Sequence, residues 1–177
     1  SVAFVQCAGS RDENHLPYCS AVCCLASLKE ATYIREQHPD SKIYIFYIDI
    51  RTPGMYEDFY AKVHSDEHIT FVKGKVSKIE RAPKTKDLIV EADNILLGEK
   101  MRVRVDMVVL ATGMVPVARA SGIVGADMVY DEYGFTDDSQ KTGIWAAGVA
   151  EKPMDVSSSV RSGTGAALKA IQGVVRD

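Results

Sequence analysis

Residues 42–50, KIYIFYIDI, are dominated by isoleucine and tyrosine, a composition that predicts a β-strand. Before them, residues 20–37 repeat apolar side chains every 3.6 residues, which predicts a helix that the segment 39–41 ends. Before that helix, residues 2–6 form a short apolar run that is typical of a buried strand. A strand, a helix and a strand in this order predict a βαβ unit with parallel strands and a right-handed crossover.

The chain after residue 50 continues as an α/β pattern. Helical spacing predicts a second helix over 56–63, and residues 69–72 resemble a third parallel strand. Residues 75–105 alternate between apolar and polar side chains around two charged turns, which predicts a β-meander across an otherwise parallel sheet. Residues 107–113 are expected to form a final buried strand that ends in a turn.

The pattern changes after Pro116. Residues 117–140 are expected to be a loop with one weak helical turn, and residues 143–148 to be a short apolar strand. The segment 155–159 is expected to be a loop that leads into a C-terminal helix over 162–175, which is rich in small residues.

Composition limits the class of protein. The chain has 177 residues, of which 46% are hydrophobic and 25% charged, so disorder and collagen-like repeats are excluded. The net charge of −3 is too small to indicate a nucleic-acid partner. No apolar run approaches the roughly 20 residues that span a membrane, so we expect no direct membrane insertion and a cytoplasmic protein. Because the chain opens on Ser1 inside a strand-like run, we expect a fragment of a longer protein.

All four cysteines lie in the first 24 residues, in the pattern C-x11-C-x3-C-C. Four thiolates are the ligand set of a zinc ion or of a four-iron cluster. The adjacent pair and the long gap fit poorly with the usual paired zinc knuckles, whereas a cluster takes one thiolate at each of four separate corners. A disulfide pair or four buried thiols remain alternatives, although the cysteines are not spread as staples. The four residues are Cys7, Cys19, Cys23 and Cys24.

The predicted elements bring these cysteines near one another. On a helix, Cys19 and Cys23 share a face at i, i+4, and Cys24 is the next residue. Cys7, at the end of the preceding strand, is placed to complete the set from the other side.

Two motifs resemble the pyridine nucleotide–disulfide oxidoreductases, in which a dinucleotide domain is inserted into an FAD domain. Residues 106–116, DMVVLATGMVP, resemble the return strand of that family, and residues 142–148, TGIWAAG, resemble its second FAD motif. Val149 stands where the family has an acidic residue that holds the flavin, so hydrogen bonds from the serines at 157–159 are expected to replace it.

The first turn departs from that family. A nicotinamide site needs G-x-G-x-x-G, but residues 6–11 read QCAGSR and the cysteine run follows. This substitution closely resembles the heterodisulfide reductase A-subunit family and the related flavoprotein subunits of the quinone-interacting membrane-bound oxidoreductase. The stretches that carry the resemblance are VQCAGSRD (5–12), YCSAVCC (18–24), YIFYIDIR (44–51) and PMDVSSSV (153–160).

The resemblance implies a Rossmann-like three-layer α/β domain over 1–115, inserted in the parent, followed at 116–177 by the C-terminal segment of an FAD-binding domain. It implies an oxidoreductase subunit that passes electrons between FAD, a 4Fe-4S cluster and partner subunits, with the chain alone expected to be inactive and a homodimer possible. The four cysteines would ligate the cluster, and no residue is assigned a catalytic role. Residues expected beside the flavin of the full-length parent are Gly113, Gly148, Val149, Ser157, Ser158 and Ser159.

Two other functions remain open from the residues: a zinc-stapled structural or subunit-interaction module, and a thiol–disulfide oxidoreductase. Among nearby charged residues, Arg11 either lies beside the cluster or flavin or pairs with Asp12 or Glu13. Asp49 is expected to form a salt bridge or cap rather than to bind a ribose, because the glycine loop is absent. His15 is expected at the surface or beside the cysteine ligands.

Overall fold

The computed structural model describes residues 1–122, 127–137, 140 and 143–175, and divides into two compact units. The first unit comprises Ser1–Cys19 and Cys23–Gly113, and the second comprises Ser20–Val22 and Met114–Asp177. That these units are an inserted domain and a piece of an FAD domain stays a prediction. Thr142 and parts of the expected loop, 123–126 and 138–139, lie outside the described residues.

The first unit is built on a parallel sheet with the strand order β3-β2-β1-β7. β1 (Val2–Val5) lies between β2 (Ile43–Tyr47) and β7 (Met107–Leu110), and its Val5 is opposite both Phe46 and Leu110. β3 (Ile69–Lys73) forms one edge and is also parallel. The expected βαβ unit and third parallel strand are therefore confirmed.

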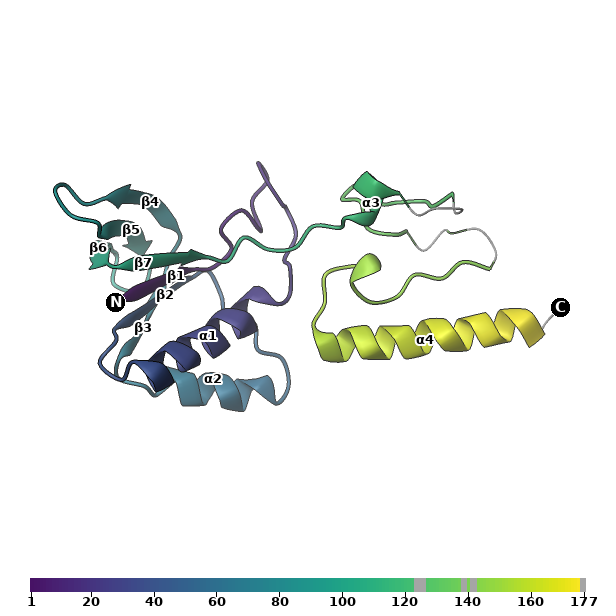
Figure 1. The fold of residues 1–177 in the computed structure, drawn as a ribbon, viewed down its shortest axis with the longest axis horizontal. Coiled ribbons are helices and arrows are strands. Elements are labelled where there is room, and N and C mark those ends of the chain that lie inside the picture. Colours follow the sequence, from purple (N-terminus) through teal and green to yellow (C-terminus); the bar gives the residue numbers. More distant parts are fainter. Residues whose placement is uncertain (123–126, 138–139, 141–142, 176–177) are drawn as a thin grey trace. The chain divides into compact units, whose positions relative to one another are not determined.

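Two further layers cover this sheet (Figure 1). Helices α1 (Cys23–Gln37) and α2 (Tyr56–His64) pack on one face, where the fully buried Phe4 and Leu28 belong to one core. The other face carries the antiparallel sheet β4-β5-β6, formed by Val76–Arg81, Leu88–Asn94 and Glu99–Val105. The Rossmann-like three-layer α/β fold is thus confirmed for the first unit.

The expected β-meander is confirmed, and it forms an antiparallel sheet of its own that lies across the parallel one. Its three strands pair only with one another among the described residues. Val90 and Val105 on its apolar face are buried against Ala3 and Phe46 of the parallel sheet. Because a parallel sheet needs cover on both faces, an alternating meander with one apolar face is suited to that layer.

Gly74 lies in the bend that connects β3 to β4. A Cβ at this position would lie 1.9 Å from the carbonyl oxygen of Asp93, so a neighbouring strand would have to move. We expect Gly74→Ala to lower the free energy of unfolding by about 1–3 kcal/mol, the usual cost of overpacking, as measured by urea unfolding. Gly163→Ala is the matched control, because a Cβ there meets nothing within 4 Å and the glycine lies inside a helix. The control should stabilise by roughly 0.5–1 kcal/mol; equal effects of the two changes would contradict this account.

The second unit has little regular structure before its last helix. α3 (Ala118–Ser121) is the expected weak turn, and a short 3-10 helix covers Gly148–Ala150. The expected strand at 143–148 was wrong: residues 143–147 have no strand pairing, and the glycines at both ends adopt positive φ angles of 93° and 62°. These left-handed angles do not continue an extended strand.

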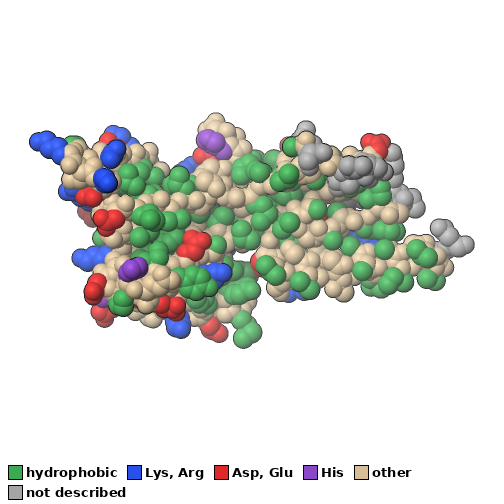
Figure 2. Space-filling view, viewed as in Figure 1, with side chains coloured by type: hydrophobic (Ala, Val, Ile, Leu, Met, Phe, Trp, Pro, Cys, Tyr) green, Lys and Arg blue, Asp and Glu red, His purple; other side chains and the backbone are tan. Residues whose placement is uncertain are grey.

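Helix α4 (Val156–Val175) begins six residues before the predicted start, so the serines at 157–159 lie inside the helix and not in a loop before it. Asp155 caps it, because the N–H of Ser158 donates to Asp155 Oδ1 at 2.6 Å. None of its residues is buried, and Figure 2 shows hydrophobic side chains along it. Exposed apolar residues of α4 include Val156, Val160, Leu168, Ile171, Val174 and Val175.

No helix in the described part of the chain combines the length and the apolar character that crossing a membrane requires.

Candidate functional site

The cysteine loop, residues 7–19, leaves the carboxyl end of β1 in an unusual backbone conformation. Cys7 and Arg11 have φ angles of 56° and 55°, a left-handed region that non-glycine residues rarely adopt. Backbone hydrogen bonds hold the loop on itself: Ser10 N–H donates to the Cys7 carbonyl at 3.3 Å, and Leu16 N–H donates to the Gly9 carbonyl at 3.1 Å. Such strain persists only where the surroundings impose it, and it often marks a functional site.

The four cysteines lie on this loop and on the helix that follows. Cys7 comes two residues after β1, Cys19 ends the loop, and Cys23 and Cys24 are the first residues of α1. Cys7 and Cys24 are buried, whereas Cys19 and Cys23 are half-buried, and no disulfide joins any of the four. All four belong to the first unit.

The expectation that Cys19 and Cys23 share a helical face was wrong. The predicted helix began at residue 20, but α1 begins at Cys23. Ala21 has a φ of 63°, which no right-handed helix accommodates, and the hydroxyl of Ser20 accepts a hydrogen bond from Met114 N at 2.8 Å. Cys19 therefore reaches the site from the loop, not from α1.

The pKa values show that the four thiols lie within electrostatic range of one another. Burial is the main cause that raises the pKa of Cys7, Cys23 and Cys24. The pKa of Cys23 is raised further by Cys24, Cys7 and Cys19, in that order. The fold therefore brings together all four cysteines that the sequence singles out.

Within the described residues, no three His, Cys, Asp or Glu side chains converge as the ligands of one metal ion do. The four cysteines stay candidate ligands either for a zinc ion or for a four-iron cluster, which takes one thiolate at each corner.

Arg11 brings a positive charge to this group of thiols. Its guanidinium forms an ion pair with the carboxylate of Asp49, and its charge opposes the effect of burial on the Cys7 pKa. Arg51 Nε lies 3.6 Å from the same Asp49 oxygen, and the Cys24 thiol donates to the Asp49 carbonyl at 3.8 Å. Asp49 thus forms a salt bridge, as the sequence indicated, and Arg11 pairs with it rather than with Asp12 or Glu13.

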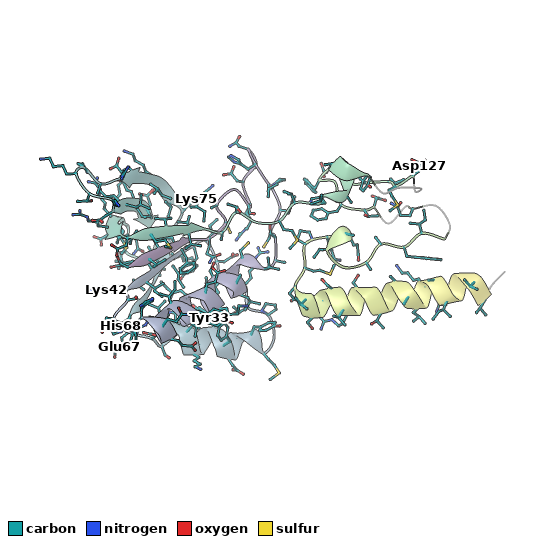
Figure 3. All side chains as sticks on the ribbon, viewed as in Figure 1. Tyr33, Lys42, Glu67, His68, Lys75 and Asp127 are labelled. Atoms are coloured by element: carbon teal, nitrogen blue, oxygen red, sulfur yellow. The ribbon has the colours of Figure 1, made fainter. Side chains whose placement is uncertain are left out.

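A second ion pair, which the sequence did not predict, joins the cysteine loop to the residue before β4. Lys75, labelled in Figure 3, lies just before β4, and its Nζ is 3.0 Å from Asp12 Oδ2. The hydrogen bond from Lys75 is the main cause that lowers the pKa of Asp12 to about 2. His15 is exposed and lies 3.7 Å from Asp12. No local signal could have revealed Lys75, because the pair joins residues 63 positions apart.

The expected flavin residues fall in both units, and most of their polar groups have partners in the chain. Gly113 ends the first unit with a φ of 98°, whereas Gly148, Val149 and the serines belong to the second. The N–H of Gly148 donates to Ser162 Oγ at 3.0 Å, and the Ser159 hydroxyl donates to the Asp155 carbonyl at 2.9 Å. Flavin binding by these residues stays a prediction.

Ser158 also lines a cavity of about 450 Å³ within the second unit. Trp145, Arg161 and Ser162 are among its other lining residues, so the cavity offers an aromatic face, a cation and hydroxyl groups.

Comparison with known proteins identifies relatives along nearly the whole chain. No protein-family model matches it. An iron-sulfur A-type subunit of the CoB–CoM heterodisulfide reductase of Methanopyrus kandleri is 39% identical over 181 residues, which cover 96% of this chain and 28% of the relative. A protein of Archaeoglobus profundus that resembles the A subunits of heterodisulfide reductase is 38% identical, over 96% of this chain and 26% of the relative.

The fold has solved counterparts as well. The thioredoxin reductase of Lactococcus lactis, in its FR conformation, has a TM-score of 0.61 and 19% identity to this chain, and the match covers 99% of this chain and 53% of the reductase. This likeness confirms the expected fold class. The chain is therefore homologous to the A subunits of heterodisulfide reductase, and it corresponds to a segment of about a quarter of their length.

Proposed function

We propose that this chain is the cluster-bearing segment of an electron-transferring oxidoreductase subunit, and that it holds one 4Fe-4S cluster. The observation that carries the proposal is the gathering of Cys7, Cys19, Cys23 and Cys24 at the carboxyl edge of the parallel sheet. The name of the Methanopyrus kandleri relative, which describes an iron-sulfur subunit, supports it. When bound, the cluster would supply one-electron transfer.

The residues of the chain fit this group. Four thiols supply one ligand for each corner, and two of them are already shielded from water. Burial raises the pKa of these thiols, which disfavours the thiolate state in the metal-free chain, and metal binding would reverse that preference. Arg11 would partly balance the negative charge of the thiolates beside it.

Arg11 provides a direct test of this electrostatic role. Arg11→Gln removes the cation that favours the Cys7 thiolate, so the reduced and more negative state loses stabilisation. We expect the midpoint potential of the reconstituted chain to become more negative by about 59 mV, the equivalent of a tenfold change for one electron. A redox titration followed by electron paramagnetic resonance measures the shift.

Arg51→Gln is the matched control, because the Arg51 side chain lies near the same Asp49 oxygen but does not influence the Cys7 thiol as Arg11 does. Equal shifts in the two variants would show that Asp49, and not the positive charge acting on Cys7, sets the effect.

FAD and partner subunits complete the proposal for the longer protein. The cavity beside Ser158 and Trp145 supports a flavin contact in the second unit, and the exposed apolar side chains of α4 support burial against further protein. The named relatives are subunits or subunit-like proteins, which favours electron exchange with partner subunits.

An anaerobic titration of the iron- and sulfide-reconstituted chain with dithionite tests electron transfer itself. We expect uptake of one electron per chain, loss of the visible absorption, and a paramagnetic signal from the reduced protein. A chain that retains iron but takes up no electrons would overturn the proposed function. A chain that binds only colourless zinc would favour the structural module instead.

A further inference from the structure

The side chain of Gln6 is the most unusual polar group in the first unit. It is only 5% exposed, and neither its amide nitrogen nor its amide oxygen has a hydrogen-bond partner among the described residues. Leaving a buried amide without partners is costly, so such a group in a folded protein needs an explanation.

The register of β1 places this side chain on the α1 face of the sheet. Gln6 N–H donates to the Phe46 carbonyl at 2.9 Å, which carries the strand pairing one residue beyond Val5. Side chains two residues apart on a strand point to the same face, and Phe4 packs in the core with Leu28 of α1. Gln6 therefore lies on that same face, at the edge of the sheet where β1 ends.

That edge is also where the candidate ligands lie. Gln6 immediately precedes Cys7, and α1 begins there with Cys23 and Cys24. The hydrogen bond from the Cys24 thiol to the carbonyl of Asp49, which follows β2, confirms that the first residues of α1 lie at this edge. The buried amide thus lies at the edge of the sheet to which Cys7, Cys23 and Cys24 also belong.

We propose that the amide N–H of Gln6 donates a hydrogen bond to a sulfur of the cluster or of a ligating thiolate, and so sets the reduction potential of the site. This inference rests on the proposed function. Sulfur atoms become more negative on reduction, so a donor stabilises the reduced state more than the oxidised state and raises the potential. Gln6 is a positioning residue in this role, because it acts through the iron–sulfur group.

The test compares Gln6→Leu and Gln6→Glu in the anaerobically reconstituted chain, with redox titration followed by electron paramagnetic resonance. Gln6→Leu keeps the approximate volume and removes the donor. It should lower the equilibrium constant for reduction about tenfold, which makes the midpoint potential more negative by about 59 mV for one electron. Gln6→Glu places a carboxylate in the same position and should give a larger shift in the same direction. Gln37→Leu, at the exposed end of α1, is the control and should cause no shift.

A second measurement separates a tuning role from a merely structural one. In the metal-free chain the amide has no partner among the described residues, so Gln6→Leu should raise the midpoint of thermal unfolding. A lower midpoint would show that Gln6 has a structural partner, and an unchanged potential would show that it does not contact the cluster; either result overturns the inference. A wild-type chain that assembles no cluster would instead overturn the proposed function, so the two failures are distinguishable.

Discussion

Cys23→Ser is expected to abolish the 4Fe-4S cluster of the reconstituted chain. Cys23 is one of only four cysteines, and the other three have no spare thiol to replace it. A serine at the first residue of α1 changes the local volume little, so the metal-free chain should keep its fold. The visible absorption and the iron and sulfide content per chain, measured after anaerobic reconstitution, should both fall to background.

Lys29→Ser is the control for this substitution, because it introduces the same residue at an exposed position of the same helix. It should retain the full absorption. A Cys23→Ser chain that still holds four irons would contradict the assignment of the ligands.

Leu28→Ala is expected to cause the largest loss of stability. Leu28 is fully buried on the inner face of α1, in the core that also contains Phe4 and Ile45. Truncating a buried leucine removes its transfer free energy and leaves a cavity, which together cost about 2–5 kcal/mol. Urea unfolding followed by far-ultraviolet circular dichroism measures this loss as a fall in the free energy of unfolding.

Leu168→Ala on α4 makes the same chemical change at a side chain that is more than half exposed, and should cost less than about 0.5 kcal/mol. Since α1 presents Cys23 and Cys24 at its first turn, Leu28→Ala should also lower the yield of reconstituted cluster. A loss no greater than that of the control would show that α1 is not held by this core.

Local sequence patterns predicted the elements of the first unit better than their arrangement. The β-branched and aromatic composition of 42–50 and the periodicity of the preceding helix predicted the parallel sheet and its helical layer. Alternation over 75–105 predicted strands, but alternation does not specify which sheet a strand joins. The separate antiparallel layer follows from the burial of Val90 and Val105 against the parallel sheet, a contact between residues far apart in sequence.

In the candidate site, too, the sequence predicted the local pattern but not the contacts between distant residues. The clustering of the four cysteines was readable from the sequence because it is a local pattern, whereas the groups around them come from distant positions. Arg11 and Asp49 are 38 residues apart, and only the fold shows that they pair. The unpartnered amide of Gln6 was also missed, because a glutamine at the end of an apolar strand carries no signal of its burial.

Two predicted helix boundaries failed, one because of a backbone conformation and one because of a side-chain cap. Helical periodicity extends through residues 20–22, but Ala21 adopts a left-handed conformation that prevents a helix from starting before Cys23. The serines at 157–159 lie inside α4 because Asp155 caps the helix, a side-chain contact that the small-residue pattern after Ser162 does not reveal.

The most direct test of the central claim is the metal content of the chain after anaerobic reconstitution with iron and sulfide in the presence of equimolar zinc. The account predicts about four irons and four sulfides per chain, little zinc, and a brown colour that dithionite bleaches. One zinc per chain with no sulfide, in a colourless protein, would contradict the claim that these four cysteines hold an iron–sulfur cluster.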